Sequence, residues 1–74
     1  MNNTREAWSF LENQMSYLLK LCKEDCNERW LHQAFGAIQL FVAIFPEEYE
    51  VTCLAWKTWK EEFEELIYGI SLSM

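Results

Sequence analysis

The sequence is poor in the residues from which turns and β-sheets are built. It has two glycines and one proline in 74 residues, too few for the many tight turns of an all-β fold. Its longest apolar stretch, residues 34–45, is interrupted by Gln39 and is shorter than the roughly 20 residues that a transmembrane helix needs. We therefore expect a helical chain that does not cross a membrane.

Basic side chains are also scarce. Six lysines and arginines stand against twelve aspartates and glutamates, for a formal net charge of −6. Because nucleic-acid binding needs a basic surface to neutralise phosphates, we do not expect nucleic acid as a direct partner. The chain contains no glycine-rich phosphate loop, no HExxH and no Gly-x-Ser-x-Gly sequence. We therefore expect no catalytic activity and no cofactor.

Three cysteines, Cys22, Cys26 and Cys53, are an odd number and cannot form a complete set of internal disulfides. With His32 they supply the donor atoms of a tetrahedral zinc site, but their spacing is a poor match to structural zinc motifs. The N-terminus, MNNTREAW, lacks the basic start and apolar run of a signal peptide. We therefore expect reduced thiols in a cytoplasmic protein without a bound metal, with Cys22 and Cys53 in the core.

Apolar and aromatic residues are abundant and recur at helical spacing. They make up 51% and 16% of the chain, which is too much for a disordered segment. Their recurrence every three to four positions predicts helices at about residues 4–23, 26–45 and 46–68. Similar lengths and short connections favour an all-α fold, a three-helix antiparallel bundle that forms a single domain over residues 1–74.

Polar side chains mark the expected starts of the first two helices. Thr4 can accept a hydrogen bond from an unpaired amide of the first turn and is a candidate N-cap. Asp25 followed by Glu28 resembles a capping box for the second helix, and Asn27 is a competent cap as well. These residues place the first connection at about residues 24–27.

The proline and the two glycines each occupy a position with structural meaning. Pro46 ends the second helix and suits the first turn of the third. Gly69 suits a left-handed C-terminal cap. Gly36 lies in the middle of the second helix, where glycine costs about 1 kcal/mol relative to alanine. We therefore expect another backbone to approach Gly36 closely.

The first helix is predicted to enter the core with one apolar stripe, which consists of Ala7, Trp8, Leu11, Met15, Leu18, Leu19 and Cys22. It carries a second apolar row nearly opposite this stripe. This row consists of Phe10, Tyr17 and Leu21. The second helix has a wider apolar arc and is expected to be central, so its neighbours cannot cover both faces of the first helix. We expect the row to complete the core by meeting its own copy in a homodimer.

The predicted core side of the third helix is Tyr49, Cys53, Trp56, Trp59, Phe63, Leu66 and Ile67.

Negative charge collects toward the end of the chain, where seven of the twelve acidic side chains lie in residues 46–74. Four of them flank Phe63. Such a run is most often a solvated helix face that keeps a small apolar protein in solution. The other interpretation is an acidic surface that engages a basic partner.

These features favour a small acidic protein–protein interaction module, homo-oligomeric and without catalytic activity, that acts as an adaptor or regulator of an unidentified protein partner. The alternative hypothesis is an acidic inhibitor that mimics nucleic acid and occupies a basic site on a target protein, as a phage or mobile-element accessory protein would. The candidate interaction residues are Phe10, Tyr17, Leu21, Glu61, Glu62, Glu64 and Glu65.

Overall fold

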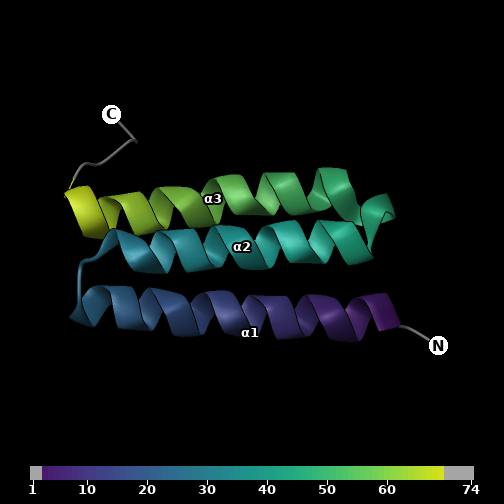
Figure 1. Ribbon diagram of the computed structural model, residues 1–74, viewed down its shortest axis with the longest axis horizontal. Helices are drawn as coiled ribbons and strands as arrows, with labels where there is room; N and C mark the ends of the chain where they lie inside the picture. The colour runs from purple at the N-terminus through teal and green to yellow at the C-terminus, as the bar shows by residue number, and fades with distance from the viewer. Residues whose placement is uncertain (1–2, 70–74) are drawn as a thin grey trace.

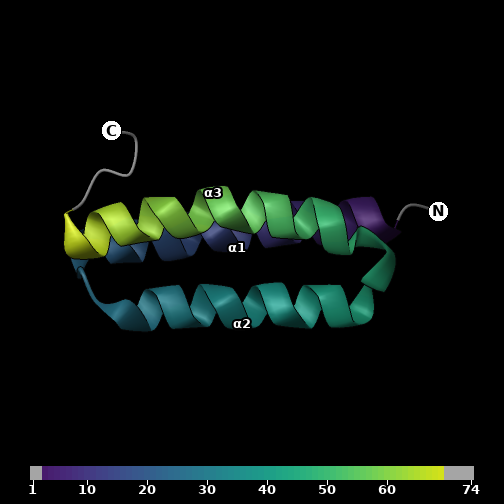
Figure 2. The same ribbon diagram turned by 90° about the horizontal axis from the view of Figure 1, so that it is seen from above.

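Three antiparallel helices make up the fold. The computed structural model describes residues 3–69, with α1 at Asn3–Glu24, α2 at Glu28–Ile44, the short 3-10 helix η1 at Pro46–Glu48 and α3 at Tyr49–Tyr68. Figure 1 shows α2 between α1 and α3, and Figure 2 shows α2 displaced from the other two, so that the three form a flattened triangle. The predicted all-α fold of three helices is confirmed.

The connection between α1 and α2 is held by two local hydrogen bonds. Asn27 is the N-cap of α2, and its side-chain oxygen accepts from the backbone N–H of Arg29 at 2.9 Å. The indole N–H of Trp30 donates to the carbonyl of Asp25 at 2.9 Å. Asn27, not Asp25, therefore caps the helix. The expected cap at Thr4 is wrong, because α1 already begins at Asn3.

Pro46 and Gly69 bound the third helical segment. Pro46 opens the 3-10 helix η1, so that α3 itself starts three residues later than expected. Gly69 adopts the left-handed conformation with φ 66° and ψ 24°, as predicted, and its N–H donates to the carbonyl of Glu65. Just before it, the Tyr68 hydroxyl donates to Glu28 at 2.6 Å and ties the end of α3 to the start of α2. This hydrogen bond raises the pKa of Tyr68.

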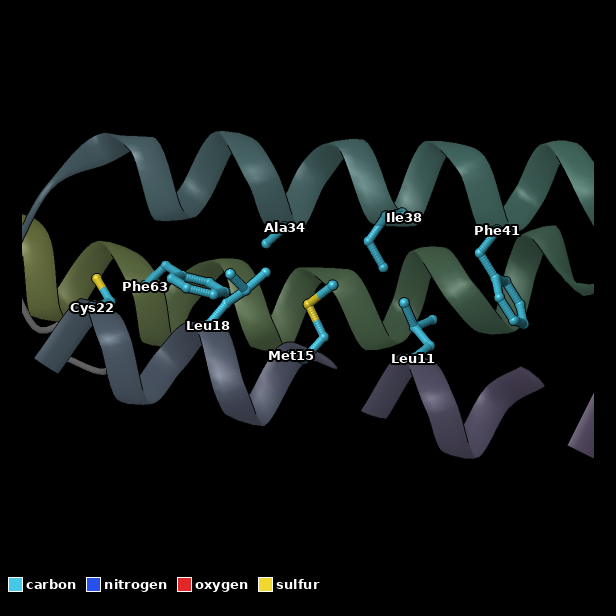
Figure 3. Close-up of a cluster of buried hydrophobic side chains, with 8 residues drawn as sticks. All are labelled: Leu11, Met15, Leu18, Cys22, Ala34, Ile38, Phe41 and Phe63. Atoms are coloured by element: carbon cyan, nitrogen blue, oxygen red, sulfur yellow. The ribbon is translucent and has the colours of Figure 1, made fainter. Parts of the chain in front are cut away.

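The core is a continuous row of apolar side chains between the helices (Figure 3). α1 supplies four of them at the expected helical spacing, so its predicted core stripe is confirmed. Three more come from α2 and point toward those of α1, while α3 supplies one phenylalanine. The buried residues are Leu11, Met15, Leu18, Cys22, Ala34, Ile38, Phe41 and Phe63.

Trp8 joins all three helices at one end of this core. Its ring centroid lies 5.6 Å from that of Phe41 in α2, in an edge-on arrangement, and 6.1 Å from that of Trp59 in α3. Aromatic pairs of this kind are worth about 0.5–1.5 kcal/mol beyond the area they bury. The half-buried tryptophans therefore fix the relative positions of the helices.

The first turns of α3 face the core with a different residue than expected. Cys53 and Tyr49 are exposed, whereas Thr52 is fully buried. Thr52 is four positions and Cys53 three positions before Trp56, so either residue can share its face of the helix. Cys53 was predicted to be buried because cysteine is the more apolar of the two, and this prediction is wrong. The Thr52 hydroxyl finds no hydrogen-bond partner within residues 3–69, so its methyl group is what suits it to this place.

The wide apolar arc of α2 is not fully covered. α2 packs against α1 and α3, but Phe35, Leu40 and Ile44 remain exposed. The expectation that this arc is buried on several sides is therefore wrong for these three residues.

Within residues 3–69, no helix has both the length and the apolar character needed to span a membrane.

Gly36 lies on the exposed side of α2. A Cβ atom added there would meet no other atom of residues 3–69 within 4 Å. The expected close approach of another backbone is therefore wrong. Glycine at this position weakens the helix without allowing a contact in return.

We therefore expect Gly36→Ala to stabilise the protein by about 0.5–1 kcal/mol, because alanine loses less backbone entropy in a helix. Thermal unfolding followed by circular dichroism should show a higher melting temperature. Gly69→Ala is the matched control, since its backbone has φ 66° and an alanine there should lower the melting temperature. A lower melting temperature for Gly36→Ala would contradict the open environment of Gly36.

Candidate interaction surface

Three strongly exposed apolar side chains gather where α1 and α2 meet. Phe10 is 73% exposed, Leu40 is 63% exposed and Ile44 is 60% exposed. They line a groove of about 490 Å³, which we call the α1–α2 groove. Its remaining lining residues are Glu6, Ala7, Leu11, Gln14, Ala37, Phe41 and Phe45.

The helical register explains why these side chains border one groove. Phe10 precedes the buried Leu11 by one position, which turns its side chain about 100° away from the core direction and onto a flank of α1. Leu40 and Ile44 are four positions apart and therefore lie side by side on α2. Since α1 and α2 are antiparallel, the first half of α1 faces the second half of α2 (Figure 1). The apolar walls of the groove follow from this pairing.

The three residues of the predicted row, Phe10, Tyr17 and Leu21, differ in their exposure. Phe10 and Tyr17 are exposed, but Leu21 is half-buried and packs against the core. Phe10 lies beside α2 in the α1–α2 groove, so the row is on a flank of α1 and not opposite the core. Leu21 is therefore not a free contact residue, and the expectation that it lies on the outer surface is wrong.

Leu40 and Ile44 were missed as surface residues because an apolar arc on a helix is usually read as core. The signal was nevertheless in the sequence. The arc of α2 is wider than two neighbouring helices can cover, so some of its members had to stay exposed. Which ones is decided only by where α1 and α3 lie.

The α1–α2 groove carries little charge for an acidic protein. Glu6 is its one charged lining residue and Gln14 its one neutral polar lining residue. The chain as a whole has a net charge of −6. An apolar surface with so few charges is a favourable place for two protein surfaces to meet.

The four predicted acidic residues on α3 do not form one row. Glu61, Glu62 and Glu65 are exposed. Glu64 is half-buried, and its carboxylate lies 3.7 Å from the Nζ atom of Lys60. Because each helical residue turns about 100°, these four residues spread over about 160° of the circumference of α3. Glu62 and Glu65 border a shallow pocket with Lys23 of α1, while Glu64 pairs with Lys60 on another side.

A second groove lies between α2 and α3 and has a different chemistry. We call it the α2–α3 groove; its volume is about 500 Å³. The rings of Phe35 and Trp56 lie beside each other in it, with centroids 5.7 Å apart. Its lining residues are Leu31, His32, Phe35, Cys53, Trp56, Lys57 and Lys60.

The cysteines lie in separate environments. Cys22 is buried, Cys26 and Cys53 are exposed, and all three are free thiols. Burial raises the pKa of Cys22. Among residues 3–69, no three His, Cys, Asp or Glu side chains gather so as to hold a metal ion. Of the four residues considered for zinc, His32 and Cys53 line the α2–α3 groove, whereas Cys22 is buried in the core with Leu18 and Phe63.

Comparison with protein-family models, with curated proteins and with solved structures gives no match. We therefore infer the function from the surface of the molecule, and above all from the α1–α2 groove and the α2–α3 groove.

We expect the three thiols to react with a disulfide reagent in two phases. Cys26 and Cys53 should react quickly in the folded protein, whereas Cys22 should react only on unfolding, because the reactive thiolate is both shielded and disfavoured there. The measurement is the absorbance change with Ellman's reagent. The Cys22→Ala variant should lose the slow phase alone, and three equally fast thiols would contradict the burial of Cys22.

Proposed function

We propose that this protein is a non-catalytic interaction module that assembles as a homodimer through the α1–α2 groove. The observation that supports the proposal is the convergence of Phe10, Leu40 and Ile44 around one weakly charged groove. Exposed apolar side chains scattered singly over a surface need no explanation, but a cluster of them around a groove is typical of a contact surface.

Because the chain is small, a partner in the α1–α2 groove that buries more apolar surface would stabilise it. Eight hydrophobic residues are buried within residues 3–69, a small core for a domain that must overcome the entropy of folding. Burying a large apolar side chain contributes about 1.5–3 kcal/mol. A symmetric contact buries Phe10, Leu40 and Ile44 from each of two copies. This gain offsets the loss of freedom on association.

The shape and charge of the surface fit a second copy of the same chain. Phe10, Leu40 and Ile44 line the same groove, so a two-fold axis can place each Phe10 against Leu40 and Ile44 of the other copy. The total accessible surface is 5365 Å², and a standard interface of about 800 Å² per subunit would cover about a seventh of it. Glu6 is the one carboxylate that lines the groove, so this face brings less like charge together than the acidic face of α3.

We expect the wild-type protein to elute as a dimer, with a mass twice the 8.9 kDa of the chain, in size-exclusion chromatography with light scattering at micromolar concentration. Leu40→Lys should shift the mass to that of the monomer, because association would strip water from the ammonium group. Leu54→Lys is the matched control. Leu54 is 70% exposed on α3, outside the α1–α2 groove, and its variant should remain dimeric.

Two further measurements show whether the change in mass reflects loss of the apolar contact. Far-UV circular dichroism should show unchanged helicity for both lysine variants, since both positions are exposed. The dimer should persist at high salt, because screening weakens charge contacts and not apolar ones. A monomeric wild-type protein, or equal dissociation of the Leu54→Lys variant, would contradict the proposed dimer. If the protein instead binds a basic target protein, and this binding weakens steeply as the salt concentration rises, the result would favour the acidic inhibitor.

A further inference from the structure

We infer that the α2–α3 groove is a binding site for small aromatic anions, such as a fused aromatic ring that carries a carboxylate. The groove combines an aromatic wall, formed by Phe35 and Trp56, with cationic side chains at its rim, Lys57 and Lys60. Neither feature is needed for the proposed dimer, and the α1–α2 groove, although it also contains phenylalanines, has no lysine, arginine or histidine among its lining residues.

The charge of this groove is opposite to that of the protein. The chain has six lysines and arginines and one histidine. Lys57, Lys60 and His32 are three of these seven, and none of the groove's lining residues is acidic. Glu64 lies 3.7 Å from Lys60, but the side chain of Lys60 is still 51% exposed. In a chain with a net charge of −6, this groove is where an anion meets favourable charge.

The aromatic wall supplies the apolar part of the site. The ring planes of Phe35 and Trp56 are inclined by 35° with centroids 5.7 Å apart. Phe35 is 44% exposed, and Trp56 is half-buried against the core. A third ring can therefore extend the pair in an offset or edge-on arrangement. The tryptophan is held in place by the core, so the wall is formed before a ligand arrives.

The dimensions favour a small molecule over a peptide helix. The lining residues of α3 run from Cys53 to Lys60, which is about 10 Å of helix at 1.5 Å per residue. The volume of about 500 Å³ lies within the range of roughly 300–1,000 Å³ that is common for small-molecule sites. A fused two-ring aromatic fits this length. Its carboxylate would reach the ammonium groups of Lys57 and Lys60 in charge-assisted hydrogen bonds.

The two grooves lie on different flanks of α2. Phe35 borders the groove with α3, whereas Leu40 and Ile44 border the groove with α1. A ligand in the α2–α3 groove therefore leaves the proposed dimer contact free. The site can be tested whether or not the protein is dimeric.

The test is a nuclear magnetic resonance titration of the full chain with 2-naphthoate and with its uncharged counterpart 2-naphthamide. The indole N–H signals of the four tryptophans report the position of the ligand, and Trp56→Phe assigns the signal of Trp56. We expect 2-naphthoate to shift the Trp56 signal saturably. 2-Naphthamide should bind at least about threefold more weakly, since an exposed charge contact is worth up to about 1 kcal/mol.

Charge variants show whether the two lysines hold the carboxylate. Lys57→Gln/Lys60→Gln should raise the dissociation constant of 2-naphthoate at least about threefold. Lys20→Gln/Lys23→Gln on α1 removes the same net charge elsewhere and should leave the dissociation constant unchanged. All four lysines are exposed, so both variants should keep the fold.

Four results would overturn the inference. One is the absence of saturable shifts at low-millimolar 2-naphthoate, and a second is equal affinity for the acid and the amide. A third is equal weakening in the Lys20→Gln/Lys23→Gln variant, which would reflect net charge alone. The fourth is a larger shift of the Trp8 signal than of the Trp56 signal, which would place the ligand near the α1–α2 groove, because the Trp8 ring lies against Phe41 of that groove.

Discussion

Each helix of a three-helix bundle turns one face toward its neighbours, and this chain has more apolar side chains than three such faces can take in. Leu11, Met15, Leu18 and Cys22 fill the inner face of α1, and Phe63 closes the core from α3. Within residues 3–69, the apolar side chains that remain include several that are exposed. The proposed function and the two grooves both follow from this surplus, because Phe10, Phe35, Leu40 and Ile44 are exposed and lie where two helices meet.

The exposed apolar residues on the two flanks of α2 have different neighbours, and the two grooves therefore differ in charge. Toward α1, Leu40 and Ile44 lie beside Phe10 with a single carboxylate among the lining residues, and the result is an apolar groove with little charge. Toward α3, Phe35 meets Trp56 and two lysines, and the result is an aromatic groove with a cationic rim. One helix thus separates a surface suited to a second protein from a surface suited to an anion.

The features that depend on local chemistry could be predicted from the sequence. The core stripe of α1, the left-handed Gly69 and the helix break at Pro46 each follow from spacing or from the conformational preferences of one residue. The features that depend on the neighbouring helices could not. Thr52 and Cys53 are both at helical spacing from Trp56, and only the position of α3 against the core decides between them. In the same way, the partial burial of Leu21 and the exposure of Leu40 are set by where α2 lies.

We propose that a second copy of the chain covers the exposed apolar side chains of the α1–α2 groove. Isotope-filtered nuclear Overhauser spectra of a sample that mixes labelled and unlabelled chains detect contacts between copies alone and therefore test this proposal. We expect cross-peaks between the ring protons of Phe10 in one copy and the methyl groups of Leu40 and Ile44 in the other. Cross-peaks that instead involve Val51 and Leu54 of α3, or none at all at millimolar concentration, would contradict it.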